Sequence, residues 1–415
     1  MGGLALLGGE KAIRQDFVKW PVFDETDVKA VEETVRSGKW NKHEGSRNSE
    51  FVKMFSGYVG TKFGLAVTNG TAALEIPLAV LGAGPGDEVI VPSYTFVSTA
   101  TAVAFNAATP VFCDVDPDTY NIDADMFESL LTPRTKAVIP VHFAGYPADM
   151  DRILEISGKH GIHIVEDCAH AHGTVYKKRK AGSFGTASAF SFQSSKNLTS
   201  GEGGIILTDD EDLYRRMYSR HSCGRLPDRP WYEHYAISSN IRLSEIQAAL
   251  LTAQFARLET QAGERLANAR RLDEGFSRFR CLTCVQPPKA EITRRAYHLY
   301  LIRYSPGIEG VSRGTFIKAL QAEGLPVSGG YPVPLYRQPL FGKIAKPVGQ
   351  KCEYSGLYHP GAERICSETI WFPQYMLLGD ESHAGRILDA VEKVLRNAGP
   401  LRKWQKDFAS GNAGV

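Results

Sequence analysis

The stretch FSFQSSKNLTSGEGGIILTDD, residues 190–210, joins two apolar runs through small polar residues, one lysine and a glycine-rich bend. The two runs are predicted to be buried strands, so Lys196 follows the end of one of them. A lysine amine in a desolvated pocket has a lowered pKa and becomes nucleophilic toward carbonyl carbons. Most lysines are only solvated charges, so the role of Lys196 depends on what the rest of the chain brings to its amine.

Short apolar runs alternate with amphipathic stretches before this segment. The runs are apolar on both faces, as in strands that are covered by helices on both sides. Alternating strands and helices predict a mostly parallel sheet with right-handed crossovers, in which ligands bind beyond the carboxyl ends of the strands. The predicted strands are residues 88–96, 109–115, 136–143, 163–170, 188–192 and 203–209.

The region after the sheet has a different pattern. One long helix is predicted over residues 242–276, followed by a strand at 297–304 and helices at 313–324 and 380–399. This order is typical of an α+β arrangement. We therefore expect two domains, a large α/β domain with an N-terminal arm at residues 1–265 and a smaller α+β domain at 266–415.

The composition is that of an ordinary soluble globular protein, with 43% hydrophobic and 23% charged residues. The 48 basic and 46 acidic side chains nearly balance, so neither a nucleic-acid partner nor a membrane partner is expected. Of the seven cysteines, only Cys281 and Cys284 have CxxC spacing, and no second pair follows, so no metal site is expected. Scattered cysteines indicate reduced thiols and a cytoplasmic location.

The segment TNGTAAL, residues 68–74, begins a predicted helix at Thr71 after the strand-like run 63–67. A helix N-terminus offers free N–H groups and partial positive charge, and Gly70 lets an anion approach the backbone. The alternative is a helix that is simply capped. The chain has neither GxGxxG nor GxxxxGK[ST] at this point, which argues against a dinucleotide or a P-loop nucleotide.

The segment VEDCAHAHG, residues 165–173, places Glu166 and Asp167 at the end of a buried strand. A buried carboxylate is costly unless it is paired. It could form a salt bridge or cap the next segment, or Asp167 could face a cationic ring nitrogen. His170 could contact the same ligand, whereas His172 is interpreted as a core histidine with its hydrogen bonds satisfied.

These features occur together on consecutive strands of one sheet: an anion cradle, a strand-end carboxylate and a lysine. A phosphorylated aldehyde with a ring nitrogen requires all three, and pyridoxal phosphate is that ligand. Two other classes stay open. The protein could bind this cofactor as a regulator without turnover, or it could be a nicotinamide-dependent sugar oxidoreductase, although the second lacks its usual fingerprint.

The sequence resembles the DegT/DnrJ/StrS family of sugar aminotransferases. The resemblance runs over nearly the whole chain, through WPVFDETDVKAVEETVRSGKWN, NGTAALEIPLAVLGAGPGDEVIVPSYTFVSTATAV, EDCAHAHG, FSFQSSKNLTSGEGG and SNIRLSEIQAALL. It implies the aspartate-aminotransferase-like (type I) fold of pyridoxal-phosphate enzymes, with a mostly parallel mixed sheet and a smaller α+β domain. Lysine at position 196, where some members have histidine and act as dehydratases, favours transamination.

The resemblance also implies roles for individual residues. Lys196 matches the lysine that binds the cofactor covalently and moves the proton, and Asp167 matches the aspartate that pairs with the ring nitrogen. His170 matches the residue beside the ring hydroxyl, and Phe96 the aromatic that stacks on the ring. The phosphate cup would consist of Gly70, Thr71 and Ser191.

Asn240 matches an asparagine that reaches the cofactor phosphate of the neighbouring subunit, so the resemblance implies a homodimer with shared active sites. Arg242 lies two residues on, and in an extended segment both side chains point to the same face. A guanidinium fork fits the carboxylate of an amino donor. The alternative is an exposed pair between Arg242 and Glu245 in the first helical turn.

The substrates are less certain from sequence. Residues 329–343 and 368–394 look more like the inosose and aminohydroxybenzoate branch than the nucleotide-sugar branch, although they could simply be packing residues. We expect glutamine or glutamate as donor and a cyclitol or sugar ketone as acceptor, with Tyr331 in contact with substrate. A nucleotide-linked keto sugar is the alternative, and Ile241, where the family often has an aromatic residue, leaves substrate details open.

Overall fold

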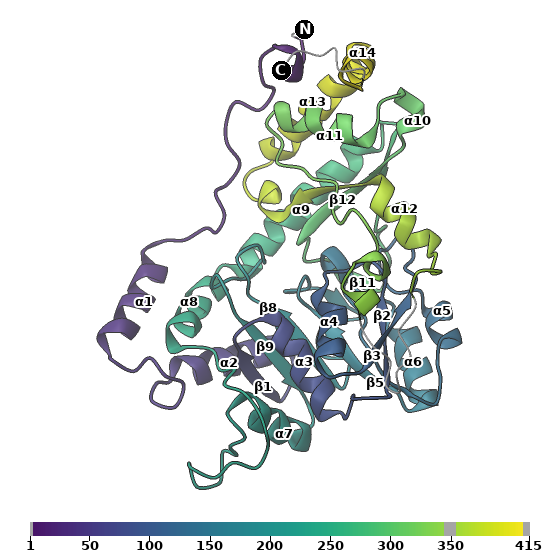
Figure 1. Cartoon of the computed structure of the whole chain (residues 1–415). Coiled ribbons are helices and arrows are strands. Elements are labelled where there is room, and N and C mark those ends of the chain that lie inside the picture. Colours follow the sequence, from purple (N-terminus) through teal and green to yellow (C-terminus); the bar gives the residue numbers. More distant parts are fainter. Residues whose placement is uncertain (1–2, 344–353, 410–415) are drawn as a thin grey trace.

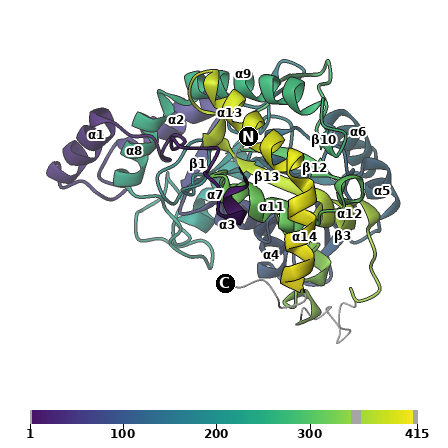
Figure 2. The same cartoon turned by 90° about the horizontal axis from the view of Figure 1, so that it is seen from above.

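The computed structural model describes residues 3–343 and 354–409. An α/β body carries the helices α11, α13 and α14 on one side of it, at the top of Figure 1, near the start and the end of the chain. The N-terminal arm runs from there down the side of the molecule to α1 (Glu25–Arg36), which projects with α8 (Figure 1). From above, α1 and the pair α5 and α6 lie at opposite ends of the body (Figure 2).

The body is built on a seven-stranded sheet in the order β1-β9-β8-β5-β4-β2-β3. Neighbours are parallel from β3 to β8, and β9 runs antiparallel to both β8 and β1. The predicted mostly parallel mixed sheet is therefore confirmed, and all six predicted strands are present, five of them shorter than predicted and β8 displaced by one residue. The strands are β1 (Phe63–Val67), β2 (Glu88–Pro92), β3 (Thr109–Cys113), β4 (Thr135–Val138), β5 (His163–Asp167), β8 (Ala187–Ser191) and β9 (Gly204–Thr208).

Successive strand residues point to opposite sides of this sheet, and those on both sides are apolar. Helices therefore cover both faces. Val89 and Val91 belong to the core on one face, whereas Ile90 belongs to the core on the other. The first face is covered by α3 (Gly70–Val80), α4 (Ser98–Phe105) and α7 (Glu211–His221). The second is covered by α2 (Arg47–Val59), α5 (Ala124–Ser129), α6 (Met150–His160) and α8 (Glu245–Phe255).

A second core lies around a smaller antiparallel sheet, β10-β12-β13, with strands Leu282–Cys284, Leu299–Tyr304 and Thr369–Pro373. The helices of this part are α9 (Leu258–Phe276), α10 (Pro306–Glu309), α11 (Arg313–Ala322), α12 (Pro360–Glu368), α13 (Ser382–Arg396) and α14 (Ala398–Ala409). A small sheet pairs β11 (Ile292–Arg294) with β6 (Val175–Tyr176) and β7 (Arg179–Lys180). The predicted boundary at residue 265 falls inside α9, and the division into two domains stays a prediction.

The prediction of a single helix over residues 242–276 is wrong. The chain is extended up to Ser244, and the helix then breaks between α8 and α9, where the N–H of Ala256 and of Arg257 bond three residues back instead of four. Side chains at the break bind the start of α1: Gln254 Nε2 donates to Asp27 Oδ1 at 2.9 Å, and Arg257 forms an ion pair with the same carboxylate. These long-range contacts hold a turn that helix periodicity alone does not predict.

Candidate active site

A pocket of about 1220 Å³ lies beyond the carboxyl ends of the parallel strands. Residues from the smaller sheet and its flanking segments also line it, among them His298, Tyr331 and Trp371, and Trp20 of the N-terminal arm forms part of its rim. This is the location expected for ligands of an open α/β sheet. Eight of the ten predicted site residues line this pocket, namely Gly70, Thr71, Phe96, Asp167, His170, Ser191, Lys196 and Tyr331.

The N-terminus of α3 forms one wall of the pocket. Asn69 is its N-cap and accepts a 2.8 Å hydrogen bond from the Ala72 N–H. A Cβ on Gly70 would lie 2.7 Å from the Ser191 Cβ, so only glycine permits this approach of the helix to β8. The predicted cap is present, and it lies beside a cradle of free N–H groups that can bind an anion.

Asp167 ends β5 and is buried at the pocket. Its carboxylate accepts hydrogen bonds from Thr99 Oγ1 at 2.9 Å and from the Ala169 N–H at 3.1 Å. Burial raises the pKa of Asp167, and these two hydrogen bonds and the Lys196 charge offset only part of this effect. Among the described residues Asp167 forms no ion pair, which leaves it suited to a cationic group of a ligand.

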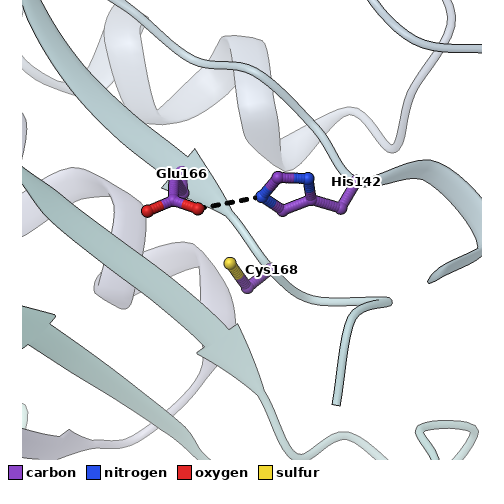
Figure 3. Close-up of side chains that lie close together, drawn as sticks. All are labelled: His142, Glu166 and Cys168. Carbon is purple, nitrogen blue, oxygen red and sulfur yellow. Dashed lines mark hydrogen bonds and ion pairs between the residues drawn. The ribbon is translucent and has the colours of Figure 1, made fainter. Parts of the chain in front are cut away.

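Glu166 points to the opposite face of the sheet, away from the pocket. It is fully buried, and its carboxylate accepts a 3.0 Å hydrogen bond from His142 Nε2 (Figure 3). Burial alone would raise the pKa of Glu166, but the hydrogen bonds it accepts lower it. Its other donors are the N–H groups of Gly182, Phe184 and Gly185, at 2.8, 2.7 and 2.7 Å.

His142, Glu166 and Cys168 have potential metal-binding atoms within 4.8 Å of one another (Figure 3). His142 Nδ1 accepts a 3.1 Å hydrogen bond from the Ala148 N–H, so its proton is on Nε2, which donates to Glu166. Burial raises the pKa of the Cys168 thiol well above its usual value. With both ring nitrogens and both carboxylate oxygens engaged, this cluster is a hydrogen-bonded structural hub rather than a set of free ligands.

Replacing Glu166 by glutamine is expected to lower the free energy of unfolding by about 2–4 kcal/mol. The amide NH₂ would face donors where Glu166 now has an oxygen, leaving buried N–H groups unpaired. Urea unfolding followed by circular dichroism measures this loss. Glu155→Gln, on the exposed side of α6, is the matched control and should change stability by less than about 0.5 kcal/mol; equal midpoints for the two variants would refute the hub.

Lys196 follows β8 and faces the pocket. The surrounding chain encloses its amine, and this burial lowers the pKa of Lys196 to about 8, although the nearby Asp167 charge opposes the shift. Among the described residues its amine forms no ion pair. A substantial fraction of the amine is therefore neutral near pH 8, as a nucleophile requires.

Two histidines stack in the pocket. His170 Nδ1 accepts a 3.2 Å hydrogen bond from the Ala144 N–H, and its ring centroid lies 4.2 Å from that of His298. His298 Nδ1 lies 3.3 Å from Asn197 Oδ1, and the Asn197 amide donates to Ala296 O. Burial lowers the pKa of both histidines well below the usual value, so both rings are neutral. The sequence analysis did not identify His298 as a site residue. It could have been found as a polar residue directly before the apolar strand 299–304.

His172 lies in the core, as predicted, but its hydrogen bonds are not satisfied. Its ring packs against Phe55, Phe190 and Phe192. Among the described residues the ring nitrogens have no partner of good hydrogen-bond geometry, and only the Ser191 backbone lies near enough to raise the pKa in part. Burial lowers the pKa of His172 to about 3, so the ring behaves as a neutral aromatic group.

Aromatic rings line one part of the pocket. Phe96 is 54% exposed, unusual for a large apolar ring, because it faces the open pocket. Its centroid is 6.5 Å from that of Tyr331, which packs against Tyr94 and Trp371. A flat ligand ring therefore has an aromatic face available to it.

Asn240 and Arg242 do not line this pocket. They lie on an extended segment that pairs with Ser222 at Asn240 and with Val67 at Arg242. Ile241, between them, does line the pocket, so by alternation the two polar side chains point away from it. The segment is extended, which is the condition on which the two side chains share a face, whereas their contact with a second subunit stays a prediction.

The alternative pairing of Arg242 with Glu245 does not occur among the described residues. The Glu245 carboxylate instead accepts backbone N–H groups of Arg47 and Asn48, at 2.6 and 3.1 Å. Arg242 Nη1 donates to Ser222 Oγ at 3.3 Å. Glu245 therefore joins α8 to the start of α2 and leaves Arg242 without a carboxylate.

The fold and pocket define an α/β enzyme of the pyridoxal-phosphate aminotransferase type. Residues 21–392 match the DegT/DnrJ/EryC1/StrS aminotransferase family, and the chain belongs to this family. The predicted family, its fold class and its aminotransferase activity are thereby confirmed. No helix within the described ranges has the length and apolar character needed to span a membrane.

Relatives agree with the predicted branch. The chain is 36% identical over 426 residues to the L-glutamine:2-deoxy-scyllo-inosose aminotransferase of Streptomyces fradiae, covering 96% of this chain and 99% of the relative. It is 38% identical over 330 residues to GDP-perosamine synthase of Caulobacter vibrioides, covering 77% and 86%. The crystal structure of 3-amino-5-hydroxybenzoic acid synthase superposes with a TM-score of 0.85 at 32% identity, covering 92% and 99%.

Proposed function

We propose that the protein transfers an amino group from glutamine or glutamate to a cyclitol ketone of the inosose type, in aminocyclitol or aminosugar biosynthesis. The observation that carries the proposal is one pocket holding a lysine amine with a pKa of about 8 beside a buried carboxylate that has no cationic partner among the described residues. The names of the inosose and hydroxybenzoate relatives support this acceptor class, and they favour it over a nucleotide-linked keto sugar.

The pocket residues fit pyridoxal phosphate. Lys196 would hold it covalently, Asp167 would pair with its ring nitrogen, and Phe96 and His170 would contact the ring and its hydroxyl. When bound, the cofactor would supply an aldehyde carbon that accepts the donor's amino group and a ring that withdraws electron density. Its phosphate would lie in the cradle of Gly70, Thr71 and Ser191.

The chain's own side chains then supply the proton chemistry. With the cofactor bound, the Lys196 amine, once released by the donor, would take the proton from the donor's Cα and deliver it to the former aldehyde carbon, on the other side of the transferred nitrogen. Asp167, oriented by Thr99, would keep the ring nitrogen protonated and so stabilise negative charge at the reacting carbon. Tyr331, beside Phe96, would contact the acceptor on the open side of the pocket.

We also propose a homodimer in which Asn240 and Arg242 reach the partner's pocket. Exposed apolar side chains on the projecting α1 and on the loop after α7 support a surface that a second copy covers. These include Phe23, Val28, Val35, Trp231, Tyr232 and Ile237, the last of which is 95% exposed. A cytoplasmic location stays a prediction.

Replacing Arg242 by lysine is expected to raise the donor concentration for half-maximal bleaching at least tenfold, about 1.4 kcal/mol. Lysine keeps the charge but loses the fork that fits a carboxylate. Stopped-flow absorbance of the half-reaction measures the effect, and cofactor affinity should barely change. Arg216→Lys, whose arginine pairs with Asp212 on α7, is the control. A donor dependence that matches wild type would assign Arg242 to structure alone.

Absorbance also tests the function as a whole. A yellow protein that L-glutamine or L-glutamate bleaches, and that an inosose restores with release of an amino-inosose, supports the proposal. Restoration only by a nucleotide-linked keto sugar would select the alternative acceptor. Bound cofactor that no amino acid bleaches would instead indicate a regulator without turnover.

A further inference from the structure

Three cations lie around the end of α7, where Lys42 bonds His221 and both Arg225 and Arg242 bond Ser222; they are here called the basic cluster. Arg242 lies on the extended segment that also carries Asn240, and Lys42 lies between α1 and α2. The positive charges of all three lower the pKa of His43, after the larger effect of burial, so they act on one region.

Lys42 is held by a neutral partner. His221 Nδ1 lies 2.7 Å from the Tyr218 carbonyl, which can only accept, so the proton is on Nδ1. The other nitrogen, Nε2, is therefore an acceptor, and Lys42 Nζ donates to it at 2.8 Å. Burial and then the Arg242 charge lower the pKa of Lys42 to about 8. The Lys42 amine therefore has a neutral hydrogen-bond acceptor, and among the described residues it forms no ion pair with a carboxylate.

The two arginines of the basic cluster also lack a carboxylate partner among the described residues. Within the described residues, the Arg242 guanidinium donates hydrogen bonds to Ser222 Oγ, at 3.3 Å, and to Cys223 Sγ, at 3.7 Å. Arg225 lies over the Trp231 ring at 5.2 Å, and its Nε is buried without a hydrogen-bond partner. Within residues 3–343 and 354–409, no member of the basic cluster forms an ion pair with a carboxylate.

Two acids act on this region, Glu245 on Lys42 and Glu44 on His43, and neither forms an ion pair with the basic cluster among the described residues. Glu245 carries a charge that favours protonated Lys42, but its carboxylate oxygens already accept the N–H groups of Arg47 and Asn48. Like charges held close together are unfavourable in a half-buried setting. A group of cations without carboxylate partners is typical of a site that binds an anion.

We propose that the basic cluster binds the carboxylate of the amino donor in the pocket of a second copy of the chain, with Lys42 and Arg225 joining Arg242. The inference rests on the proposed transaminase function and dimer. A cyclitol ketone has no charge, and the cofactor phosphate has its own cradle at Gly70. The donor carboxylate is therefore the anion left for these three cations beside the Asn240 segment.

Kinetics of the holoenzyme test the proposal. Lys42→Met should raise the L-glutamine concentration for half-maximal bleaching at least fivefold, whereas the exposed Lys39→Met should not. With L-glutaminamide, which lacks the carboxylate, Lys42→Met should behave like wild type. Unchanged dependence on L-glutamine would overturn the proposal, as would an effect confined to the acceptor half-reaction or to cofactor retention.

A binding readout separates this inference from the proposed function. Trace acetylation of wild-type holoenzyme at pH 8, mapped by mass spectrometry, should label Lys42, and 2-methyl-L-glutamine, which has no Cα proton to lose, should protect it. Lys39 should be labelled equally with and without the analogue. If L-glutamine fails to bleach the enzyme but the analogue still protects Lys42, the proposed function fails and the carboxylate site stands. Labelling of Lys42 that the analogue leaves unchanged would overturn the carboxylate site.

Discussion

Lys196→Ala is expected to abolish covalent attachment of pyridoxal phosphate and to reduce turnover to background. The variant loses both the nucleophile that holds the cofactor and the group that moves the proton. Borohydride reduction of the wild type, followed by peptide mapping, identifies the lysine that carries the label. Label on any other lysine would exclude the assignment, and Lys39→Ala, with an exposed lysine removed, is the control.

The fold of this variant is expected to be intact. In the cofactor-free protein the pKa of Lys196 is about 8, below the 10.5 of an unfolded lysine. Folding therefore carries a cost that is absent above about pH 10.5, grows as pH falls and is fully present below pH 8. Lys196→Ala removes this cost, so the cofactor-free variant should be at least as stable as wild type at pH 7, as thermal unfolding at pH 7 and pH 10.5 can measure.

Asp167→Asn is expected to keep the cofactor and lose two to four orders of magnitude in turnover, roughly the effect of removing a key electrostatic group. The amide can still accept the hydrogen bond from Thr99, but it cannot hold a proton on the ring nitrogen. Steady-state rates with cofactor content measured on the same sample separate lost catalysis from lost binding.

Glu166→Gln is the matched control for Asp167→Asn, because it alters the neighbouring carboxylate on the other face of the same strand. It should lose stability but keep its turnover per folded molecule. Turnover of Asp167→Asn near the wild-type rate would show that another group serves the ring nitrogen.

Much of the sheet could be predicted from sequence because each strand is apolar on both faces and lies between turn residues. What could not be predicted depends on contacts distant in sequence. The break between α8 and α9 follows from the contacts of Gln254 and Arg257 with Asp27, more than 220 residues earlier, whose side chains give no local helix-stop signal. Periodicity reports which face of a helix is buried, not where tertiary contacts bend it.

The site was predictable where a motif joins a strand end to chemistry, as at Asp167 and Lys196. Whether Glu166 or Asp167 faces the ligand was open in sequence, and the pleat of β5 decides it. His298 and Trp20 reach the pocket from distant segments without a motif of their own. The contacts of Asn240 and Arg242 with a partner depend on a second copy of the chain, so a single chain does not test them.

The hub at Glu166 has a consequence for how the enzyme tolerates change. A one-residue slip of β5 against β8 would exchange the two acidic side chains, turning Asp167 inward and Glu166 toward the pocket. Four hydrogen-bond donors surround the Glu166 carboxylate on one face, and the shorter side chain of Asp167 would not reach all of them after this slip. The hub therefore favours one register of β5 against β8. Substitutions around β5 are limited by the need to fold in this register as well as by catalysis.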